Sequence, residues 1–324
     1  MNAALPRVPC SAVVFAYHNV GARGLRVLHD AGIQVRLVVT HRDNPNEVLW
    51  FERVADVAAE YGWPCILPED PNTPEVAQQV RACHADFVFS LYYRKMLSPA
   101  LLACGARGAY NMHGSLLPRY RGRAPVNWAV LHGERQTGAT LHVMDAKPDH
   151  GAIVDQQAVP ILGDDTARQV FDKVTLAAEM VLARSLPALV AGTARLTPQE
   201  HLPGQYFGGR SPEDGRIPAQ ASAAQIHNLV RAVAPPDYPG AFFDVSTPVG
   251  LKRLLVARTR HLPTPASAPR GRLELIAAQP HIHLVAADGQ MLEVLALQCE
   301  GRVLDAGALV AQFGPGPLSP VASS

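Results

Sequence analysis

The stretch VVFAYHNVGARGLRVLHDAGIQVRLVVT, residues 13–40, decides the fold class of this chain. Its apolar run Val13–Tyr17 predicts a first strand, and Ile33–Thr40 predicts a second. Between them, a turn is expected at Asn19–Gly21, followed by a helix over Leu25–Ala31. Two strands joined by a crossover helix are parallel neighbours in one sheet. The stretch therefore predicts an α/β protein.

The same alternation continues through the first two thirds of the chain. Helices are expected at residues 47–61, 74–83, 125–133 and from Asp165 or Thr166 to Ala191, and strands at 64–67, 86–91, 108–112, 137–144 and 153–159. This pattern is typical of a Rossmann-like, doubly wound and mainly parallel sheet. Ligands of such sheets bind beyond the carboxyl ends of the strands, so the loops that follow strands are the places to search for a site.

The pattern changes after residue 200. His201–Pro218 is rich in Gly, Pro and charge and predicts a linker, and Ala223–Ala232 predicts one helix. Short strands are then expected at 240–245, 251–258, 272–277, 281–286 and 291–297, with a hairpin turn at Asp288-Gly289. We therefore expect a catalytic domain over residues 1–203, a smaller β-rich domain of OB-like barrel type over 204–314, and a disordered tail over 315–324.

Composition and charge exclude several classes of protein. The 324 residues carry 29 Lys+Arg and 28 Asp+Glu, without the broad basic excess of a nucleic-acid binder. The five cysteines are odd in number, widely spaced and form no CxxC pair, which argues against a disulfide framework or a structural zinc site. Residues 1–9 lack the apolar core of a signal peptide, and no uninterrupted apolar run approaches the ~20 residues of a membrane helix. We expect a cytoplasmic protein that binds no metal and does not insert into membranes.

One segment after a predicted strand carries candidate chemistry. Asn111 and His113 are two residues apart, so a strand points both side chains to the same side. An amide can stabilise a developing oxyanion, and an imidazole can move a proton near neutral pH. A carboxylate follows at Asp149, and placed beside His113 it would raise the pKa of the imidazole. Taken alone, the Asn-x-His spacing favours a polar loop that satisfies its own backbone over a catalytic pair.

A longer pattern surrounds these residues. Residues 111–118 (NMHGSLLP), 138–145 (GATLHVMD) and Asp149-x-Gly151 together resemble the core motif of the folate-dependent formyltransferases, and the likeness extends from residue 12 to about 300. The resemblance implies that the chain passes a formyl group from 10-formyltetrahydrofolate to an amine. It also implies that Asn111 stabilises the tetrahedral oxyanion and His113 is the general acid and base. Asp149 would raise the pKa of His113 or help to accept the amine proton.

Further segments are similar to the sugar branch of this family, namely residues 15–18 (FAYH), 40–45 (THRDNP), 89–94 (FSLYYR) and 119–128 (RYRGRAPVNW). The closest likeness is to the branch that formylates UDP-4-amino-4-deoxy-L-arabinose, which serves the modification of lipid A and polymyxin resistance. Bifunctional members of that branch also carry a UDP-glucuronate decarboxylase domain. No segment of this sequence corresponds to it, so we expect a stand-alone transferase.

The resemblance also implies a set of binding residues. The folate would be held, largely through backbone contacts, by Lys95, Met96, Leu97, Arg123, Asp145, Ala146, Lys147 and Pro148. For the nucleotide sugar we expect Tyr93 and the arginines Arg119 and Arg121, whose forked donors suit phosphate. The alternative for the arginines is a solvated charge cluster, and Tyr93 could instead pack in the core.

Three other functions stay open at this stage. The first is methionyl-tRNA formyltransferase, which is disfavoured because residues 40–50 carry one Arg against an Asp and a Glu. The second is a formyltransferase for another nucleotide-linked amino sugar, such as a dTDP-4-amino-hexose. The third is a folate-binding module or a formyltetrahydrofolate hydrolase, which needs no amine. The oligomeric state is not predicted.

Overall fold

The computed structural model describes residues 10–43, 49–199, 206–248, 250–263 and 271–321. The chain divides into two compact units, which are taken separately below. The first contains residues 1–125, 136–160 and 171–208, and the second contains residues 126–135, 161–170 and 209–324.

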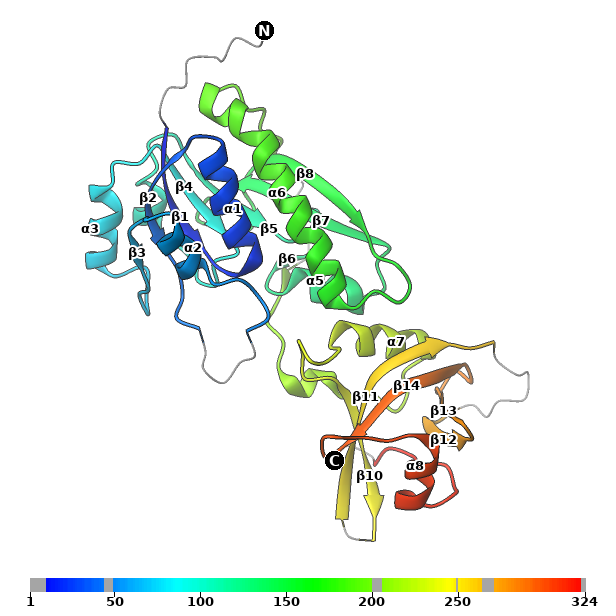
Figure 1. The fold of residues 1–324 in the computed structure, drawn as a ribbon. Helices are drawn as coiled ribbons and strands as arrows, with labels where there is room; N and C mark the ends of the chain where they lie inside the picture. The colour runs from blue at the N-terminus through cyan, green and yellow to red at the C-terminus, as the bar shows by residue number, and fades with distance from the viewer. Residues whose placement is uncertain (1–9, 44–48, 200–205, 249, 264–270, 322–324) are drawn as a thin grey trace. The chain divides into compact units, whose positions relative to one another are not determined.

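The first unit is built on a mixed sheet with the strand order β3-β2-β1-β4-β5-β7-β8 (Figure 1). Its strands are β1 (Ser11–Ala16), β2 (Gln34–Val39), β3 (Cys65–Ile66), β4 (Phe87–Leu91), β5 (Ala109–His113), β7 (Gln136–Val143) and β8 (Ile153–Pro160). The pairs among β3, β2, β1, β4 and β5 are parallel, whereas β7 is antiparallel to both β5 and β8. The expected mainly parallel α/β sheet is confirmed.

Helices cover both faces of this sheet. They are α1 (His18–Asp30), α2 (Val54–Glu60), α3 (Pro74–Ala82), α4 (Pro99–Leu102) and α6 (Ala167–Ala191), whereas α5 (Pro125–Leu131) belongs almost wholly to the second unit. Figure 1 shows α1 and α6 side by side on one face, where Arg23 and Glu179 form an ion pair between them. On the opposite face, Val13 and Phe15 of β1 pack in one buried cluster with Val80 and Leu101. Both faces of β1 are therefore buried, which explains its continuous apolar run.

The expected turn at Asn19–Gly21 is wrong, because these residues lie in the first turns of α1. A Cβ atom at Gly24 would lie 2.5 Å from Leu91 Cδ1, and one at Gly21 would lie 3.0 Å from Ala16 Cβ. The two glycines therefore allow the helix to approach the sheet closely. Glycine in this segment serves packing and does not mark a turn.

Helix α2 begins at Val54, seven residues later than expected. Of the expected N-terminal part, residues 47 and 48 lie outside the described residues, and residues 49–53 are not helical. The Phe51 ring stacks on the His18 ring with centroids 4.2 Å apart, and the Glu52 backbone N–H donates to Asn19 Oδ1 at 2.8 Å. These contacts with α1 hold the segment in a non-helical path despite its helical periodicity.

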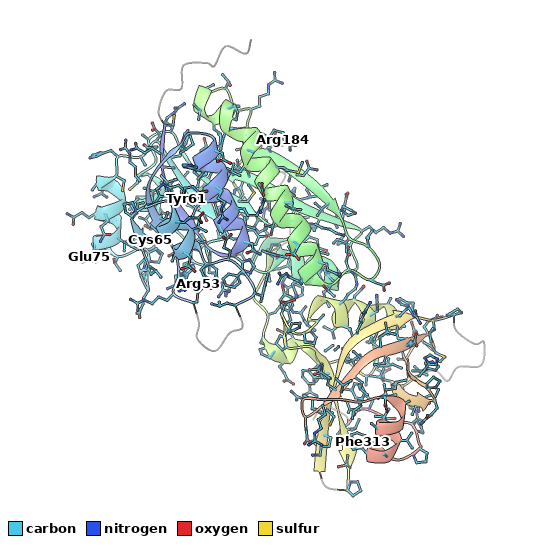
Figure 2. The ribbon with its side chains drawn as sticks, in the orientation of Figure 1. Arg53, Tyr61, Cys65, Glu75, Arg184 and Phe313 are labelled. Carbon is cyan, nitrogen blue, oxygen red and sulfur yellow. The ribbon has the colours of Figure 1, made fainter. Side chains whose placement is uncertain are left out.

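Helix α6 is long and apolar enough to pass for a membrane span by length and composition, although charged residues interrupt it. Half of its most apolar window is buried inside the protein, as in the core helix of a globular domain. Arg184 on its outer side forms an ion pair with Asp155 of β8 at 2.7 Å (Figure 2). The helix packs on the sheet of the first unit, and this packing accounts for its apolar composition.

The second unit contains an antiparallel sheet with the order β10-β11-β14-β13-β12 and with β15 paired to β14. Its strands are β10 (Ala241–Thr247), β11 (Gly250–His261), β12 (Glu274–Ala278), β13 (His281–Val285), β14 (Met291–Cys299) and β15 (Arg302–Val303), and its helices are α7 (Ala223–Ala232), α8 (Ala306–Phe313) and the 3₁₀ turn Pro212–Gly215. Ile226 of α7 packs in one buried cluster with Phe243, Leu254 and Leu284 of the sheet. The sheet is an antiparallel half-barrel, which confirms the β-rich C-terminal part.

Two features near the C-terminus differ from expectation. The sequence pattern did not predict α8, whose first turn is capped by Asp305, with Oδ1 accepting from the Ala308 N–H at 2.7 Å. Residues 315–321 were expected to be disordered, yet Leu318 forms a reciprocal pair of backbone hydrogen bonds with Leu275 at 2.8 and 2.9 Å. Backbone pairing with β12 therefore orders a segment whose Gly and Pro content suggested none.

Candidate active site

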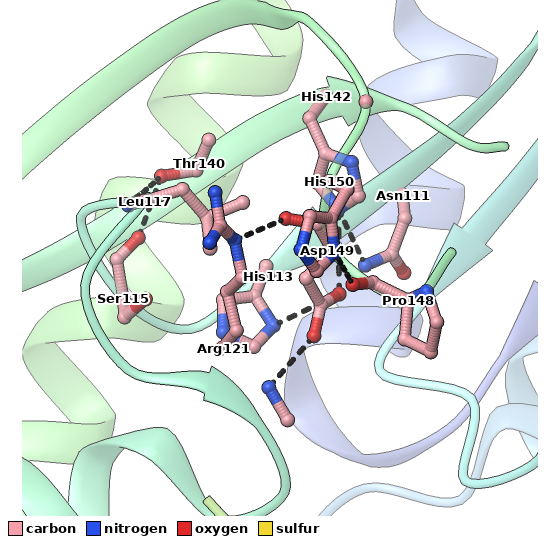
Figure 3. Close-up of polar contacts among 12 residues, drawn as sticks. Asn111, His113, Ser115, Leu117, Arg121, Thr140, His142, Pro148, Asp149 and His150 are labelled. Atoms are coloured by element: carbon pink, nitrogen blue, oxygen red, sulfur yellow. Dashed lines mark hydrogen bonds and ion pairs between the residues drawn. The ribbon is translucent and has the colours of Figure 1, made fainter. Parts of the chain in front are cut away.

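Asn111 and His113 lie on β5, in the middle and at the end of the strand. In the antiparallel register with β7, Asn111 is opposite His142 and His113 is opposite Thr140. All four side chains therefore lie on one face of the sheet, because side chains alternate along a strand. Figure 3 shows Asn111, His113 and His142 grouped on that face. This agrees with the expected common direction of Asn111 and His113.

Asp149 reaches the same place from the loop that joins β7 to β8. Its Oδ1 atom lies 3.5 Å from His113 Nδ1 and 3.6 Å from His142 Nε2 (Figure 3). Its Oδ2 atom accepts a hydrogen bond from the Gly122 backbone N–H at 2.8 Å. The structure thus brings together the amide, the imidazole and the carboxylate that the sequence motif places up to 38 positions apart.

The surroundings of Asp149 favour its charged form. Burial by itself raises the pKa of this carboxyl, but the neighbouring rings of His113 and His142 and the hydrogen bond from the Gly122 N–H together hold the pKa well below its usual range. The group is therefore a carboxylate throughout the physiological pH range. A buried carboxylate beside His113 stabilises a positive charge on that ring when the ring takes up a proton.

The tautomer of His113 follows from its second contact. His113 Nε2 lies 2.8 Å from the Tyr120 carbonyl oxygen, and a carbonyl can only accept. Nε2 therefore carries the hydrogen, and Nδ1 is the atom that gains or loses a proton, directly opposite Asp149. The ring is only 6% exposed, so its orientation is held by the protein.

The rest of the NMHGSLLP segment holds the loop that carries Tyr120. Ser115 Oγ donates to the Arg119 carbonyl at 2.6 Å, and the Leu117 N–H donates to Thr140 Oγ1 at 3.2 Å. Thr140 Oγ1 in turn donates to the Ser115 carbonyl at 2.6 Å. These bonds tie the loop to β7 and so fix the carbonyl that orients His113.

A second small sheet holds the loop at Gly122. Strand β6 (Arg121–Gly122) pairs in parallel with β9 (Tyr206–Phe207). Gly122 has φ +97°, and a Cβ atom there would lie 2.2 Å from the Phe207 carbonyl oxygen. Only glycine fits this position, and its N–H is the one that binds Asp149.

Gln199 belongs to the same network and was not expected from the sequence. Its Nε2 group donates to the carbonyls of Asp149 at 3.0 Å and Gly151 at 2.7 Å, and its Oε1 atom accepts from Arg121 Nη2 at 2.9 Å. Gln199 therefore holds the backbone on both sides of Asp149 from a position 50 residues away. No local pattern marks it. His142 was also missed, although it lies in the quoted motif and its pairing with Asn111 follows from the register of two predicted strands.

The residues expected to bind folate lie in three loops. In the loop after β4, Lys95 and Met96 are exposed. Leu97 of the same loop is buried in the core cluster with Val80 and Leu101. The Met96 carbonyl accepts from Asn72 Nδ2 at 3.0 Å. In the other two loops the exposed residues are Arg123, Asp145, Ala146 and Lys147, and Pro148 is half-buried. Their contacts with a folate stay predictions.

Two residues expected to bind the nucleotide sugar, Arg121 and Tyr93, contact other groups of the protein, and their contacts with a substrate stay predictions. Arg121 is 3% exposed, and its guanidinium donates to the Asp149 carbonyl at 3.1 Å as well as to Gln199. Tyr93 is buried, stacks on His41 with centroids 4.0 Å apart, and burial raises its pKa to about 12. The Arg121 guanidinium is held by acceptors within the protein, and the Tyr93 ring packs against His41. Arg119 is exposed, and its contact with a phosphate stays a prediction.

Comparisons with known proteins show the family of this chain. The family model described as formyl transferase matches residues 13–186, and the model described as formyl transferase, C-terminal domain, matches residues 210–313. Within the described residues, no group of three His, Cys, Asp or Glu side chains is placed to hold a metal ion.

Solved structures of sugar N-formyltransferases share the fold. One is an N-formyltransferase from Helicobacter canadensis in complex with folinic acid and dTDP-3-aminofucose, at 18% identity and TM-score 0.66, covering 89% of this chain and 99% of that one. A second is WlaRD, a sugar 3N-formyltransferase in the presence of dTDP and 5-N-formyl-THF, at 17% identity and TM-score 0.67, covering 90% and 98%. A third is a sugar N-formyltransferase from Shewanella, at 18% identity and TM-score 0.58, covering 75% and 95%. With both of its parts matched by the family models, the chain belongs to the formyl transferase family.

Proposed function

We propose that this enzyme transfers the formyl group of 10-formyltetrahydrofolate to the 4-amino group of UDP-4-amino-4-deoxy-L-arabinose in the cytoplasm. The observation that carries the reaction class is the grouping of Asn111, His113 and Asp149 on one buried face, with His113 Nδ1 opposite a carboxylate. Relatives that share the fold are described with formylated folates and with a dTDP-linked amino sugar. The choice of UDP-4-amino-4-deoxy-L-arabinose rests on segments 40–45, 89–94 and 119–128 of the sequence.

In the proposed reaction the amine nitrogen attacks the formyl carbon, and the carbonyl electron pair moves to oxygen. Asn111 donates an N–H to that oxyanion, which is the charge that develops in the transition state. When the oxyanion collapses, the bond from the formyl carbon to folate N10 breaks. His113 takes the proton lost by the amine at Nδ1 and passes it to N10, and Asp149 stabilises the imidazolium in between. The products are the formamide and tetrahydrofolate.

The test is a panel assay with the purified protein and 10-formyltetrahydrofolate. We expect UDP-4-amino-4-deoxy-L-arabinose to give a higher kcat/KM than UDP- or dTDP-linked amino-hexoses. Faster turnover of a dTDP-linked sugar would replace the proposed acceptor and leave the chemistry in place. Tetrahydrofolate release at the same rate without any acceptor would instead identify a hydrolase. A role for this formylation in lipid A modification follows only if the arabinose substrate is preferred.

A further inference from the structure

His142 is a buried titratable side chain that the proposed reaction does not use. It is 2% exposed, and it lies directly opposite Asn111 in the pairing of β5 with β7. Its Nδ1 atom lies 2.8 Å from the Val143 carbonyl oxygen, so Nδ1 carries a hydrogen. In the neutral ring, Nε2 therefore carries a lone pair and can only accept a hydrogen bond. This atom faces Asn111 Nδ2 at 3.0 Å and Asp149 Oδ1 at 3.6 Å (Figure 3).

An acceptor at this position decides whether the N–H₂ group or the oxygen of the Asn111 amide faces His142. The two ends of a carboxamide have almost the same shape, so packing alone does not distinguish them. A neutral His142 accepts one N–H of Asn111 and thereby excludes the orientation that would bring Asn111 Oδ1 against the Nε2 lone pair. The second N–H of the same group stays available as a donor. An oxyanion needs this donor, whereas an amide oxygen in its place would repel it.

A protonated His142 would have the opposite effect. Its Nε2 atom would become a donor, would repel the Asn111 N–H₂ group, and would favour either Asp149 or the Asn111 oxygen. Asp149 also faces His113 Nδ1 at 3.5 Å, so two imidazoles share one carboxylate. One negative charge balances one imidazolium, and the proposed reaction places that positive charge on His113.

We propose that neutral His142 is a positioning residue that locks the Asn111 amide with its N–H₂ group toward the reaction centre. This inference rests on the proposed role of Asn111.

The test compares His142→Gln with His142→Leu. The glutamine offers a neutral acceptor at a similar reach, and the leucine offers none. We expect His142→Leu to lower kcat by about 10- to 100-fold, as for a lost oxyanion donor, with little change in either KM. We expect His142→Gln to recover most of that loss, because its carboxamide oxygen can accept from Asn111 in place of the imidazole. His29→Leu, at an exposed histidine on α1, is the matched control and should behave like the wild type.

The outcomes separate this inference from the proposed function. If Asn111→Ala abolishes turnover while His142→Leu keeps kcat within twofold, the lock does not exist but the proposed chemistry stands. If Asn111→Ala itself keeps full activity, the proposed function fails first. Should the leucine variant not fold, His142→Met replaces it as a side chain with only a weak acceptor, and a kcat within twofold of the wild type would then overturn the inference. If the inference holds, adding Asn111→Ala to the His142→Leu variant should lower kcat little further.

Discussion

Replacement of Gln199 by methionine should damage both the stability of the first unit and its catalysis. The methionine keeps the length of the side chain and removes its amide. Gln199 is 8% exposed and makes two hydrogen bonds to neutral carbonyls and one to the Arg121 guanidinium. At about 0.5–1.5 kcal/mol for each neutral bond and about 1.5–3 kcal/mol for the charged one, the loss comes to about 3–6 kcal/mol.

The same change should lower kcat, because the carbonyls of Asp149 and Gly151 lose the group that holds the loop between β7 and β8. A misplacement of about 1 Å at a reacting group costs on the order of 10² in rate. Denaturant unfolding and steady-state turnover of one protein preparation measure both effects. Gln78→Met, at an exposed position on α3, is the matched control and should stay within about 0.5 kcal/mol of the wild type.

This reasoning would be refuted by a Gln199→Met protein whose free energy of unfolding is within about 1 kcal/mol of the wild-type value and whose kcat is unchanged. Gln199→Glu provides a further check. Its carboxylate can still accept from Arg121, but it faces the carbonyl oxygens of Asp149 and Gly151 with no hydrogen to donate. We therefore expect a loss of stability at pH 7 in this variant as well, in spite of the new ion pair with Arg121.

Three further predictions concern the candidate active site. Asn111→Ala and His113→Ala should each lower kcat by about 10² or more in protein that still folds, measured by turnover with calorimetry as the check of folding. Asp149→Asn should unfold at lower denaturant concentration than the wild type at pH 7. Since the folded-state pKa of Asp149 is depressed, its contribution is present above the unfolded pKa of about 3.9 and is lost below it, so the two unfolding curves should converge in strong acid. Gly122→Ala should reduce kcat and stability together, because its Cβ would meet the Phe207 carbonyl; normal unfolding and turnover would contradict the close approach described above.

The sequence alone determined the class of the fold and much of the catalytic face. Alternating strand and helix patterns gave the parallel core of the first unit, because hydrophobic periodicity is a local property of the chain. The two-residue repeat of a strand placed Asn111 and His113 on one side, and the structure agrees. The helix over Ala223–Ala232 was predicted to the residue, since Ser222 and Gln225 form a local capping box at its start.

Only the tertiary structure decided which polar residues hold the loops around the candidate site. Arg121 is close to Arg119 in sequence and was given the same expected role, yet it is buried against Gln199 and the Asp149 carbonyl. Gly21 and Gly24 carry turn signals, but their lack of a Cβ serves the packing of α1 on the sheet. These outcomes depend on atoms that approach from segments tens of residues away. Burial and hydrogen-bond partners arise only when the strands pair, so no local pattern of residues contains them.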